Sequence, residues 1–249
     1  MLRAVAALAI RARAVKELML GEPELATLGS LVPAQTVAVD VGAHKGVYTY
    51  WLSRICSHVH AIEPVPSLAD LVEAAELKNV SMHRWAASSK VGRATLYLPR
   101  RDGRLVLSRS SLLVDANVGY NLEESSVETR PIDALHLKDV GFIKIDVEGN
   151  ELDALKGAEL TVEQSRPTLL IESELRHGTG PHAIHEYLAG RNYEGLFISD
   201  GEILPFERFS DAVHQGPPLR RTGRTPGYIN NFIFVHASKL DRVSRLLRR

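Results

Sequence analysis

The sequence predicts an α/β fold with a Rossmann-like, mostly parallel sheet flanked by helices, and two segments carry this prediction. Residues 37–63 read as a buried strand, a glycine turn, a helix and a second strand, and residues 142–172 again read as strand, helix and strand. Strands that alternate with helices favour a parallel sheet covered by helices on both faces. We expect an N-terminal helical extension over residues 1–30 and one α/β domain over residues 31–249.

Each expected element follows from a local pattern. Short apolar, β-branched runs bounded by turn residues predict strands, and apolar residues at helical spacing predict helices. Ser67 stands where it could cap the helix that follows it. The last two strands could form a terminal hairpin that adds an antiparallel edge to the sheet. The expected strands are 37–41, 58–62, 80–86, 94–98, 142–145, 168–171, 195–199 and 231–236, and the expected helices are 46–57, 67–77, 152–164 and 184–190.

Residues 1–20 are apolar but are interrupted by basic residues. The interruptions leave no run of about 18–20 apolar residues, so we expect no transmembrane span, and they also argue against a signal peptide. The alternative is an amphipathic helix that covers the sheet or joins a partner chain, and the second option would give a homodimer. The basic residues are Arg3, Arg11, Arg13 and Lys16, and the expected apolar stripe is Leu2, Val5, Leu8, Ala12 and Val15.

Composition argues against several classes of protein. Lys+Arg and Asp+Glu both number 30 in the 249 residues, and this balance argues against a general nucleic-acid-binding protein. The single cysteine, Cys56, excludes an intramolecular disulfide and a thiolate metal cage. We expect a cytoplasmic protein. The segment 216–228, rich in Pro, Gly and Arg, reads as a surface loop, with a lid or a contact to an anionic substrate as the alternatives.

The first strand ends in a glycine turn that is typical of nucleoside sites. The turn runs from Asp40 to Gly46 in a D-x-G-x-x-x-G pattern, and Glu63 follows at the end of the next strand. Parallel α/β sheets bind nucleosides at such strand ends, where glycine lets the backbone approach a ligand and an acid can accept both ribose hydroxyls. His44 stands where the dinucleotide pattern requires its second glycine, so a pyrophosphate is disfavoured. An acid before the turn suits a ligand with a cationic amino-acid tail, such as S-adenosylmethionine (SAM).

A second group of acids follows the later strands. Asp146 and Glu172 each end an apolar strand. Glu148 lies two residues beyond Asp146, and Gly149 permits the bend that would turn both acids into one crevice. Three carboxylates in one crevice repel one another, and Mg²⁺ with oxygen ligands would neutralise them. The alternative is that Glu148 or Glu172 is structural and accepts hydrogen bonds from the backbone or from Arg166.

Together these residues give a sequence that resembles the FkbM family of SAM-dependent methyltransferases. The resemblance runs from about residue 37 to residue 172, and a weaker resemblance covers residues 231–235. The family usually has Asn at the position of His44, and TRPIDAL here replaces a commoner threonine–leucine–aspartate run. The resemblance implies a class I methyltransferase fold. It is carried by VDVGAHKGVYT, AIEPVPSL, WAASSKVGRATLYL, the triplet Ser110-Ser111-Leu112, FIKIDVEGNELDALKGA and RPTLLIE.

The resemblance also implies a SAM site at the ends of the first two strands. Glu63 would hold the ribose, and residues near Trp85 and Ala86 would border the adenine. Asp146 would lie beside the methyl group. Trp85 has an alternative as a core aromatic that caps a strand end. The residues implied around the cofactor are Asp40, Gly42, Ala43, His44, Gly46 and Thr49.

These expectations combine into an O-methyltransferase that acts on a hydroxyl of a sugar, an oligosaccharide or a glycosylated metabolite. A hydroxyl is a poor nucleophile near neutral pH, so it needs a general base or a metal ion. A nitrogen acceptor, a non-sugar metabolite and a non-catalytic SAM-binding module stay open as alternatives. The expected catalytic residues are Asp146, His177 and Glu148, with His44 as a further candidate base, and the expected Mg²⁺ ligands are Asp146, Glu172 and Glu148.

Overall fold

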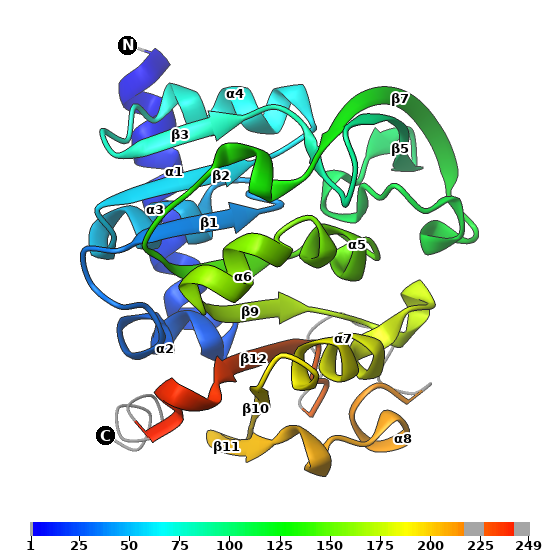
Figure 1. The fold of residues 1–249 in the computed structure, drawn as a ribbon. Coiled ribbons are helices and arrows are strands. Elements are labelled where there is room, and N and C mark those ends of the chain that lie inside the picture. The colour runs from blue at the N-terminus through cyan, green and yellow to red at the C-terminus, as the bar shows by residue number, and fades with distance from the viewer. Residues whose placement is uncertain (1, 217–226, 242–249) are drawn as a thin grey trace.

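A computed structural model describes residues 2–216 and 227–241, with the side chains of residues 2–5 and 20 excepted. A central sheet of eight strands runs through this part of the chain (Figure 1). Its strands are β1 (Val37–Val41), β2 (His58–Ile62), β3 (Val80–His83), β8 (Val140–Ile145), β9 (Thr168–Glu172), β10 (Tyr193–Ser199), β11 (Glu202–Pro205) and β12 (Asn231–His236). Their order is β11-β10-β12-β9-β8-β1-β2-β3, which confirms the predicted Rossmann-like α/β sheet.

Strand direction divides the sheet into two parts. β3, β2, β1, β8 and β9 are parallel to one another. β12 is antiparallel to both β9 and β10, and β10 is antiparallel to β11, which confirms the predicted antiparallel edge. Residues 195–199 and 231–236 belong to paired strands but form no terminal hairpin, because β12 inserts between β9 and β10 and β11 takes the edge.

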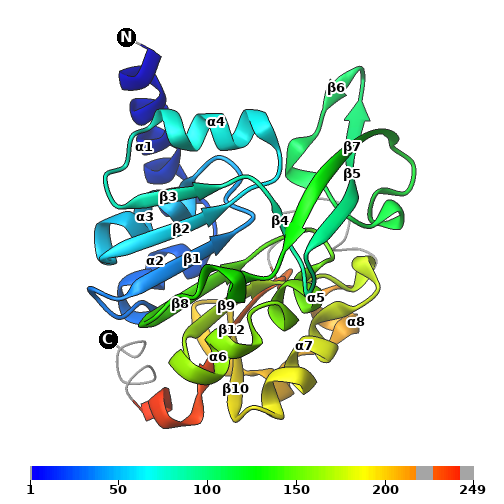
Figure 2. The same ribbon diagram turned by 45° about the horizontal axis from the view of Figure 1, so that its top comes forward.

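Helices cover both faces of the sheet (Figures 1 and 2). They are α1 (Leu2–Leu20), α2 (Pro23–Leu31), α3 (Val47–Ile55), α4 (Pro66–Ala74), α5 (Glu151–Lys156), α6 (Glu159–Ser165), α7 (Gly180–Ala189) and α8 (Asp211–His214). α2 and α3 pack against one face, around Ala38 and Phe142, and α1 lies against α3 and α4. α5, α6 and α7 pack against the other face, around Val39 and Ile143.

A smaller sheet stands beside the main one (Figure 2). Its strands are β4 (Ala86–Ala87), β5 (Gly92–Arg101), β6 (Arg104–Leu105) and β7 (Asn121–Arg130), in the order β4-β7-β5-β6. Of this sheet the sequence predicted residues 94–98 in β5 and residue 86 in β4, whereas β7 was missed because it is polar at most positions and has no apolar period. The predicted strand 80–86 is divided between β3 and β4, which belong to different sheets.

Two helix predictions are corrected. The predicted helix 152–164 is broken into α5 and α6 at Gly157, where a Cβ would lie 2.1 Å from the carbonyl oxygen of Ser88. Ser67 does not cap α4, because the helix begins at Pro66 and has no side-chain cap. Proline suits that first position, since its missing N–H would have no partner within the helix.

The N-terminal helix is present, but its predicted buried stripe is wrong. Leu8 and Val15 are 66% and 40% exposed, whereas Ile10 and Ala14 are fully buried. Helical spacing fits either set, and contacts with the distant helices α3 and α4 decide between them. Within the described residues, no helix combines the length and apolarity that crossing a membrane requires. Most of the predicted loop at 216–228 lies outside the described residues.

Candidate active site

A cavity of about 370 Å³ opens at the carboxyl ends of the parallel strands. Residues at the ends of β1, β2, β8 and β9 line it, together with the glycine turn after β1. Ala86, Ala87 and residues between 107 and 112 line it from the smaller sheet, and Arg13, Glu17 and Glu22 line it from the N-terminal helical segment. The carboxyl edge of a parallel sheet is where α/β folds bind their ligands.

The glycine turn is held by the sheet itself. Gly42 and Ala43 donate their backbone N–H groups to the carbonyl oxygen of Ile62, at 2.9 and 3.1 Å. Gly42 has a φ of 80°, and a Cβ there would lie 1.8 Å from the carbonyl oxygen of Asp146. Gly42 is therefore needed where two strand ends meet, and it also lines the cavity, where the sequence placed it. We expect any side chain at position 42 to disturb the fold as well as the cavity.

Asp40 is buried at the end of β1, and its carboxylate is held by α3. Oδ2 of Asp40 accepts a hydrogen bond of 2.5 Å from the hydroxyl of Thr49. Burial raises the pKa of Asp40 to about 6, against the opposing effects of Thr49 and Lys144. The structure thus brings together the two expected cofactor residues Asp40 and Thr49, and Asp40 lines the cavity.

Glu63 reaches the cavity with both carboxylate oxygens already placed. Oε2 accepts the backbone N–H of His44 at 2.8 Å, and Oε1 accepts that of Val65 at 2.9 Å. A carboxylate has about four acceptor positions, so each oxygen can still accept a hydroxyl. Burial raises the pKa of Glu63 to about 7, and the two backbone donors oppose this rise.

The remaining residues expected at the cofactor do not all reach the cavity. Ala43, His44 and Ala86 line it, whereas Trp85 is 5% exposed and packs in the core. The alternative role of Trp85 as a core aromatic therefore fits the structure. Burial lowers the pKa of His44 to about 4, so this histidine is a weak proton acceptor, contrary to its place among the candidate bases.

Asp146 is balanced by a buried lysine. The side chain of Lys144 is 1% exposed, and its Nζ lies 3.3 Å from Oδ2 of Asp146, whose side chain is 32% exposed. Burial lowers the pKa of Lys144, but the surrounding carboxylates outweigh burial and hold that pKa above its ordinary value. Those carboxylates are Asp146, Glu22, Glu172 and Asp40. Lys144 supplies at this strand end the positive charge that the sequence analysis assigned to Mg²⁺.

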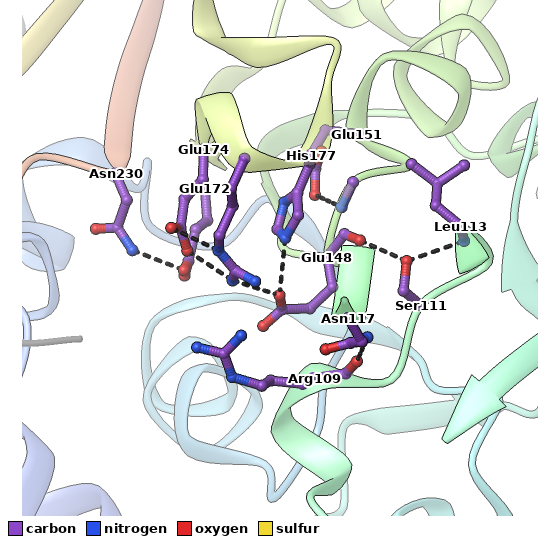
Figure 3. A network of polar contacts seen from close by, with 12 residues as sticks. Arg109, Ser111, Leu113, Asn117, Glu148, Glu151, Glu172, Glu174, His177 and Asn230 are labelled. Atoms are coloured by element: carbon purple, nitrogen blue, oxygen red, sulfur yellow. Dashed lines mark hydrogen bonds and ion pairs between the residues drawn. The ribbon is translucent and has the colours of Figure 1, made fainter. Parts of the chain in front are cut away.

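The chain bends after Asp146, and the bend turns Glu148 into the lining of the cavity. Glu148 and Gly149 have φ values of 52° and 112°, so the bend includes the residue before the predicted glycine. The hydroxyl of Ser111 donates to the carbonyl oxygen of Glu148 at 2.6 Å and accepts the N–H of Leu113 at 3.0 Å (Figure 3). Ser111 therefore ties the smaller sheet to the bend.

Two residues of the short 3-10 helix η4 (Leu175–His177), Arg176 and His177, lie at the carboxylate of Glu148, and Figure 3 shows His177 pointing toward it. Nη2 of Arg176 donates to Oε2 of Glu148 at 2.9 Å, and Nε of Arg176 donates to Glu174 at 2.8 Å. Nε2 of His177 lies 3.3 Å from the same oxygen of Glu148, without the alignment of a hydrogen bond.

The location of His177 corrects the expectation that it meets a ligand. His177 is buried and does not belong to the cavity lining that the described residues form. It faces the oxygen of Glu148 instead, so any influence on a bound ligand would pass through that carboxylate.

Glu172 ends β9 and is held by a residue next to β12. Nδ2 of Asn230 donates to Oε1 of Glu172 at 2.7 Å (Figure 3). Burial, and then the charge of Asp146, raise the pKa of Glu172 well above its ordinary value. Arg166, the partner considered from the sequence, is exposed at the end of α6, before β9 begins.

The expected Mg²⁺ ligands do not form one donor set. Within the described residues, no three Asp, Glu, His or Cys side chains gather where they could hold an ion. Each expected ligand is engaged elsewhere: Asp146 with Lys144, Glu148 with Arg176, and Glu172 with Asn230. Since cations of the chain already balance two of these acids, the residues present do not fit the expected magnesium site.

Sequence reasoning missed four residues that shape the site: Arg176, Asn230, Arg13 and Lys45. Arg176 and Asn230 bind acids far from them in sequence, and no local pattern announces such contacts. The positions of Arg13 and Lys45 in the sequence did give a weak indication of their role. Lys45 lies inside the glycine turn, and Arg13 interrupts an otherwise apolar helix.

The Methyltransferase FkbM domain matches residues 40–194, which include both groups of acids at the cavity. No curated protein matched the chain.

Several solved structures are similar to this chain. Methyltransferase FkbM from Methylobacillus flagellatus KT is 18% identical with a TM-score of 0.52, over 93% of this chain and 58% of that one, so this chain spans 58% of that protein's length. A Streptococcus mutans protein in complex with SAH is 9% identical with a TM-score of 0.49, over 86% of this chain and 97% of that one. An O-methyltransferase from Bacillus cereus in complex with SAH is 12% identical with a TM-score of 0.47, over 92% of this chain and 89% of that one. The fold is that of the class I methyltransferases, and the chain belongs to the FkbM methyltransferase domain family.

Proposed function

We propose that the chain is a SAM-dependent O-methyltransferase that acts on a hydroxyl of a sugar, an oligosaccharide or a glycosylated metabolite. The observation that carries the proposal is the placement of Glu63. Two backbone N–H groups fix its oxygens, and its carboxylate faces the cavity with acceptor capacity to spare. Two neighbouring ribose hydroxyls match that arrangement, and membership of the FkbM family supports SAM as the nucleoside.

The cavity fits the adenosine end of SAM in size and lining. Its volume of about 370 Å³ falls in the range of small-molecule sites, roughly 300–1,000 Å³. Apolar surface for an adenine is offered beside Glu63 by Ile62, Pro64, Ala86 and Ala87. When bound, SAM supplies a methyl group on a positively charged sulfur.

The acceptor would lie against the acids at the ends of β8 and β9. Asp146 and Glu148 line the cavity there and can accept hydrogen bonds from hydroxyl groups. Such bonds would orient one hydroxyl toward the methyl group, and alignment contributes most to a displacement of this kind. A sugar suits these acids because it offers several hydroxyl donors.

Asp146 is the first candidate for the group that takes the hydroxyl proton. Its side chain is 32% exposed at the cavity, and Lys144 holds it in place. Glu148 is the second candidate, with Arg176 and His177 as residues that position it. Removal of the proton by a positioned carboxylate contributes typically 10²–10⁴-fold to a rate.

A methyl-transfer screen tests the proposed function. Purified protein would be incubated with SAM and with panels of sugars, oligosaccharides, glycosylated metabolites, amines and non-sugar alcohols, and release of S-adenosylhomocysteine would be measured. We expect release with a member of the sugar panels and a methylated hydroxyl in its product. Methylation of amines or non-sugar alcohols alone would overturn the acceptor class. Absence of SAM binding in calorimetry would overturn the proposal as a whole.

A further inference from the structure

The N-terminal helix α1 reaches the cavity; two contacts fix it there, and a third holds Glu22 just beyond its end. A Cβ on Gly46 would lie 3.3 Å from Ile10, so Ile10 packs directly against the end of the glycine turn. The indole N–H of Trp51 in α3 donates to the carbonyl oxygen of Ala14 at 3.1 Å. At the end of this segment, the hydroxyl of Tyr48 donates to Glu22 at 2.6 Å. Arg13 lies between the buried residues of α1, so its position is set by the same packing.

Arg13 and Lys45 stand together in the cavity lining. Both are half-buried and line the cavity, one from α1 and one from the glycine turn. Burial lowers the pKa of Lys45, and the charge of Arg13 lowers it further, whereas Glu17 opposes them. Within the described residues, no hydrogen bond or ion pair joins either cation to an acid. Two neighbouring half-buried cations repel each other, and an anion bound between them would relieve that repulsion.

The rest of the cavity cannot hold an anion. Lys144 is the other cation in its described lining, but its charge is already shared among Asp146, Glu22, Glu172 and Asp40. The ends of β1, β2, β8 and β9 otherwise present acids, which repel a carboxylate. An anionic group in this cavity is therefore directed to Arg13 and Lys45.

We propose that Arg13 and Lys45 bind the carboxylate of the amino-acid end of SAM. This inference rests on the proposed function. Lys45 follows His44, whose N–H binds Glu63, so the cation pair lies next to the group that would hold the ribose. The amino-acid end of SAM carries one carboxylate and one ammonium group. The ammonium suits the acids of the cavity, and the carboxylate suits this pair. The N-terminal helix would then be part of the cofactor site.

An anionic group on the acceptor could use the same pair, and the ligands in the test distinguish the two sources. Calorimetry would compare SAM with decarboxylated SAM, which keeps the adenosine, the sulfonium and the ammonium but lacks the carboxylate. No acceptor would be present. We expect Arg13→Gln and Lys45→Gln each to weaken SAM binding at least tenfold, as expected for a charge-assisted hydrogen bond. Binding of decarboxylated SAM should stay within twofold of wild type.

Two matched controls lie on the same helix. Arg11 and Lys16 are exposed on α1 and do not line the cavity, so Arg11→Gln and Lys16→Gln should leave both affinities unchanged. A further measurement uses the wild-type protein alone. For the wild-type protein, SAM affinity should fall more steeply with added salt than the affinity for decarboxylated SAM, because salt screens the additional charge pair.

The outcomes separate the inference from the proposed function. Equal weakening of both ligands in the Arg13 and Lys45 variants would show a structural role and overturn the inference. Unchanged SAM affinity together with a raised KM for an anionic acceptor would assign the pair to the acceptor, and this too would overturn it. A wild-type protein that binds neither ligand would overturn the proposed function. If a variant unfolds, the salt dependence of the wild type decides, and equal slopes would contradict the inference.

Discussion

The two ends of the cavity hold their acids in different ways. At the ends of β1 and β2, Asp40 and Glu63 are bound by neutral donors, a threonine hydroxyl and two backbone N–H groups. Burial raises their pKa values to about 6 and about 7. After β8, Asp146 and Glu148 are instead paired with the cations Lys144 and Arg176, whereas Glu172 at the end of β9 is held by the neutral amide of Asn230. An acid held by neutral donors gains from a cationic ligand, whereas an acid paired with a cation already has its charge balanced.

This difference fits the task that we propose for each end. Glu63 has fixed oxygens and an unbalanced charge, which suits a nucleoside that carries positive charge on its tail. Asp146 and Glu148 are oriented by Lys144 and Arg176, which suits acceptance of hydrogen bonds from a neutral hydroxyl. The same pairs offset part of the repulsion for which the sequence suggested Mg²⁺, although the charge of Asp146 still raises the pKa of Glu172.

Asp146→Asn should give the largest effect and separate the two ends. The change keeps the shape of the side chain but removes the charge that would accept a proton. We expect turnover to fall about 100-fold or more, with SAM affinity within about threefold of wild type. Release of S-adenosylhomocysteine and calorimetry would measure the two quantities, and Asp211→Asn on the exposed helix α8 serves as control. Turnover within threefold of wild type would exclude Asp146 as the base and make Glu148 the next residue to test.

Glu63→Ala should act at the other end and weaken SAM binding. Hydrogen bonds to a charged group contribute about 1.5–3 kcal/mol each, so we expect a loss of tenfold or more. The change also leaves the N–H groups of His44 and Val65 unpaired, so thermal melting must accompany the titration. Glu123→Ala, an exposed acid on β7, is the matched control. Unchanged affinity in a folded Glu63→Ala protein would remove Glu63 from the site.

The pKa of Glu63 predicts how SAM binding depends on pH. Glu63 loses its proton near pH 7, and an ionised carboxylate is the stronger acceptor for ribose hydroxyls. Wild-type affinity should therefore rise several-fold between pH 6 and pH 8. Glu63→Gln does not titrate and should flatten this rise. A slope that survives in Glu63→Gln would point to another group, with Asp40 and its pKa of about 6 the first to examine.

Glu24 extends the comparison from binding to stability. Glu24 is 4% exposed on α2, and burial raises its pKa from 4.5 to about 7. The folded state therefore holds this proton more tightly than the unfolded state, so stability is lost as the pH rises from about 4.5 to about 7. Glu24→Gln should remove that loss. Relative to wild type, Glu24→Gln should gain on the order of 1–3 kcal/mol more free energy of unfolding at pH 8 than at pH 4.5, which corresponds to a Tm difference of roughly 3–10 °C. If the Tm difference between Glu24→Gln and wild type is the same at both pH values, the raised pKa of Glu24 is contradicted.

Chelation should have the smallest effect. Because Lys144 and Arg176 balance Asp146 and Glu148, we expect turnover in EDTA to stay within twofold of untreated protein. Loss of turnover in EDTA, restored by added Mg²⁺, would show that these cations do not replace an ion.

The fold could be predicted where its pattern is local. β1, β2 and β12 begin and end at the residues expected from the sequence. The break at Gly157 could not be predicted, because its cause is the carbonyl oxygen of Ser88 in a distant segment. The buried side of α1 was also predicted wrongly, since α3 and α4 select Ile10 over Leu8.

The site residues, too, could be predicted where their pattern is local and not where their partners are distant in sequence. The turn from Asp40 to Gly46 and the acid Glu63 lie close in sequence, and their pattern predicted a set of residues that do meet at one cavity. The partners of the later acids lie farther away: Arg176 is 28 residues from Glu148, and Asn230 is 58 residues from Glu172. Without those partners the acids looked unbalanced, and an ion seemed required.

The central claim is that Glu63 binds the cofactor and Asp146 performs the chemistry. Calorimetry at pH 8 tests it most directly, with SAM titrated into wild type, Glu63→Gln and Asp146→Asn. At this pH Glu63 is ionised, so the difference between the glutamate and its amide is fully expressed. The account predicts binding to wild type, affinity at least tenfold weaker in Glu63→Gln, and affinity within threefold of wild type in Asp146→Asn. Equal affinities in all three proteins, or a larger loss in Asp146→Asn than in Glu63→Gln, would contradict it.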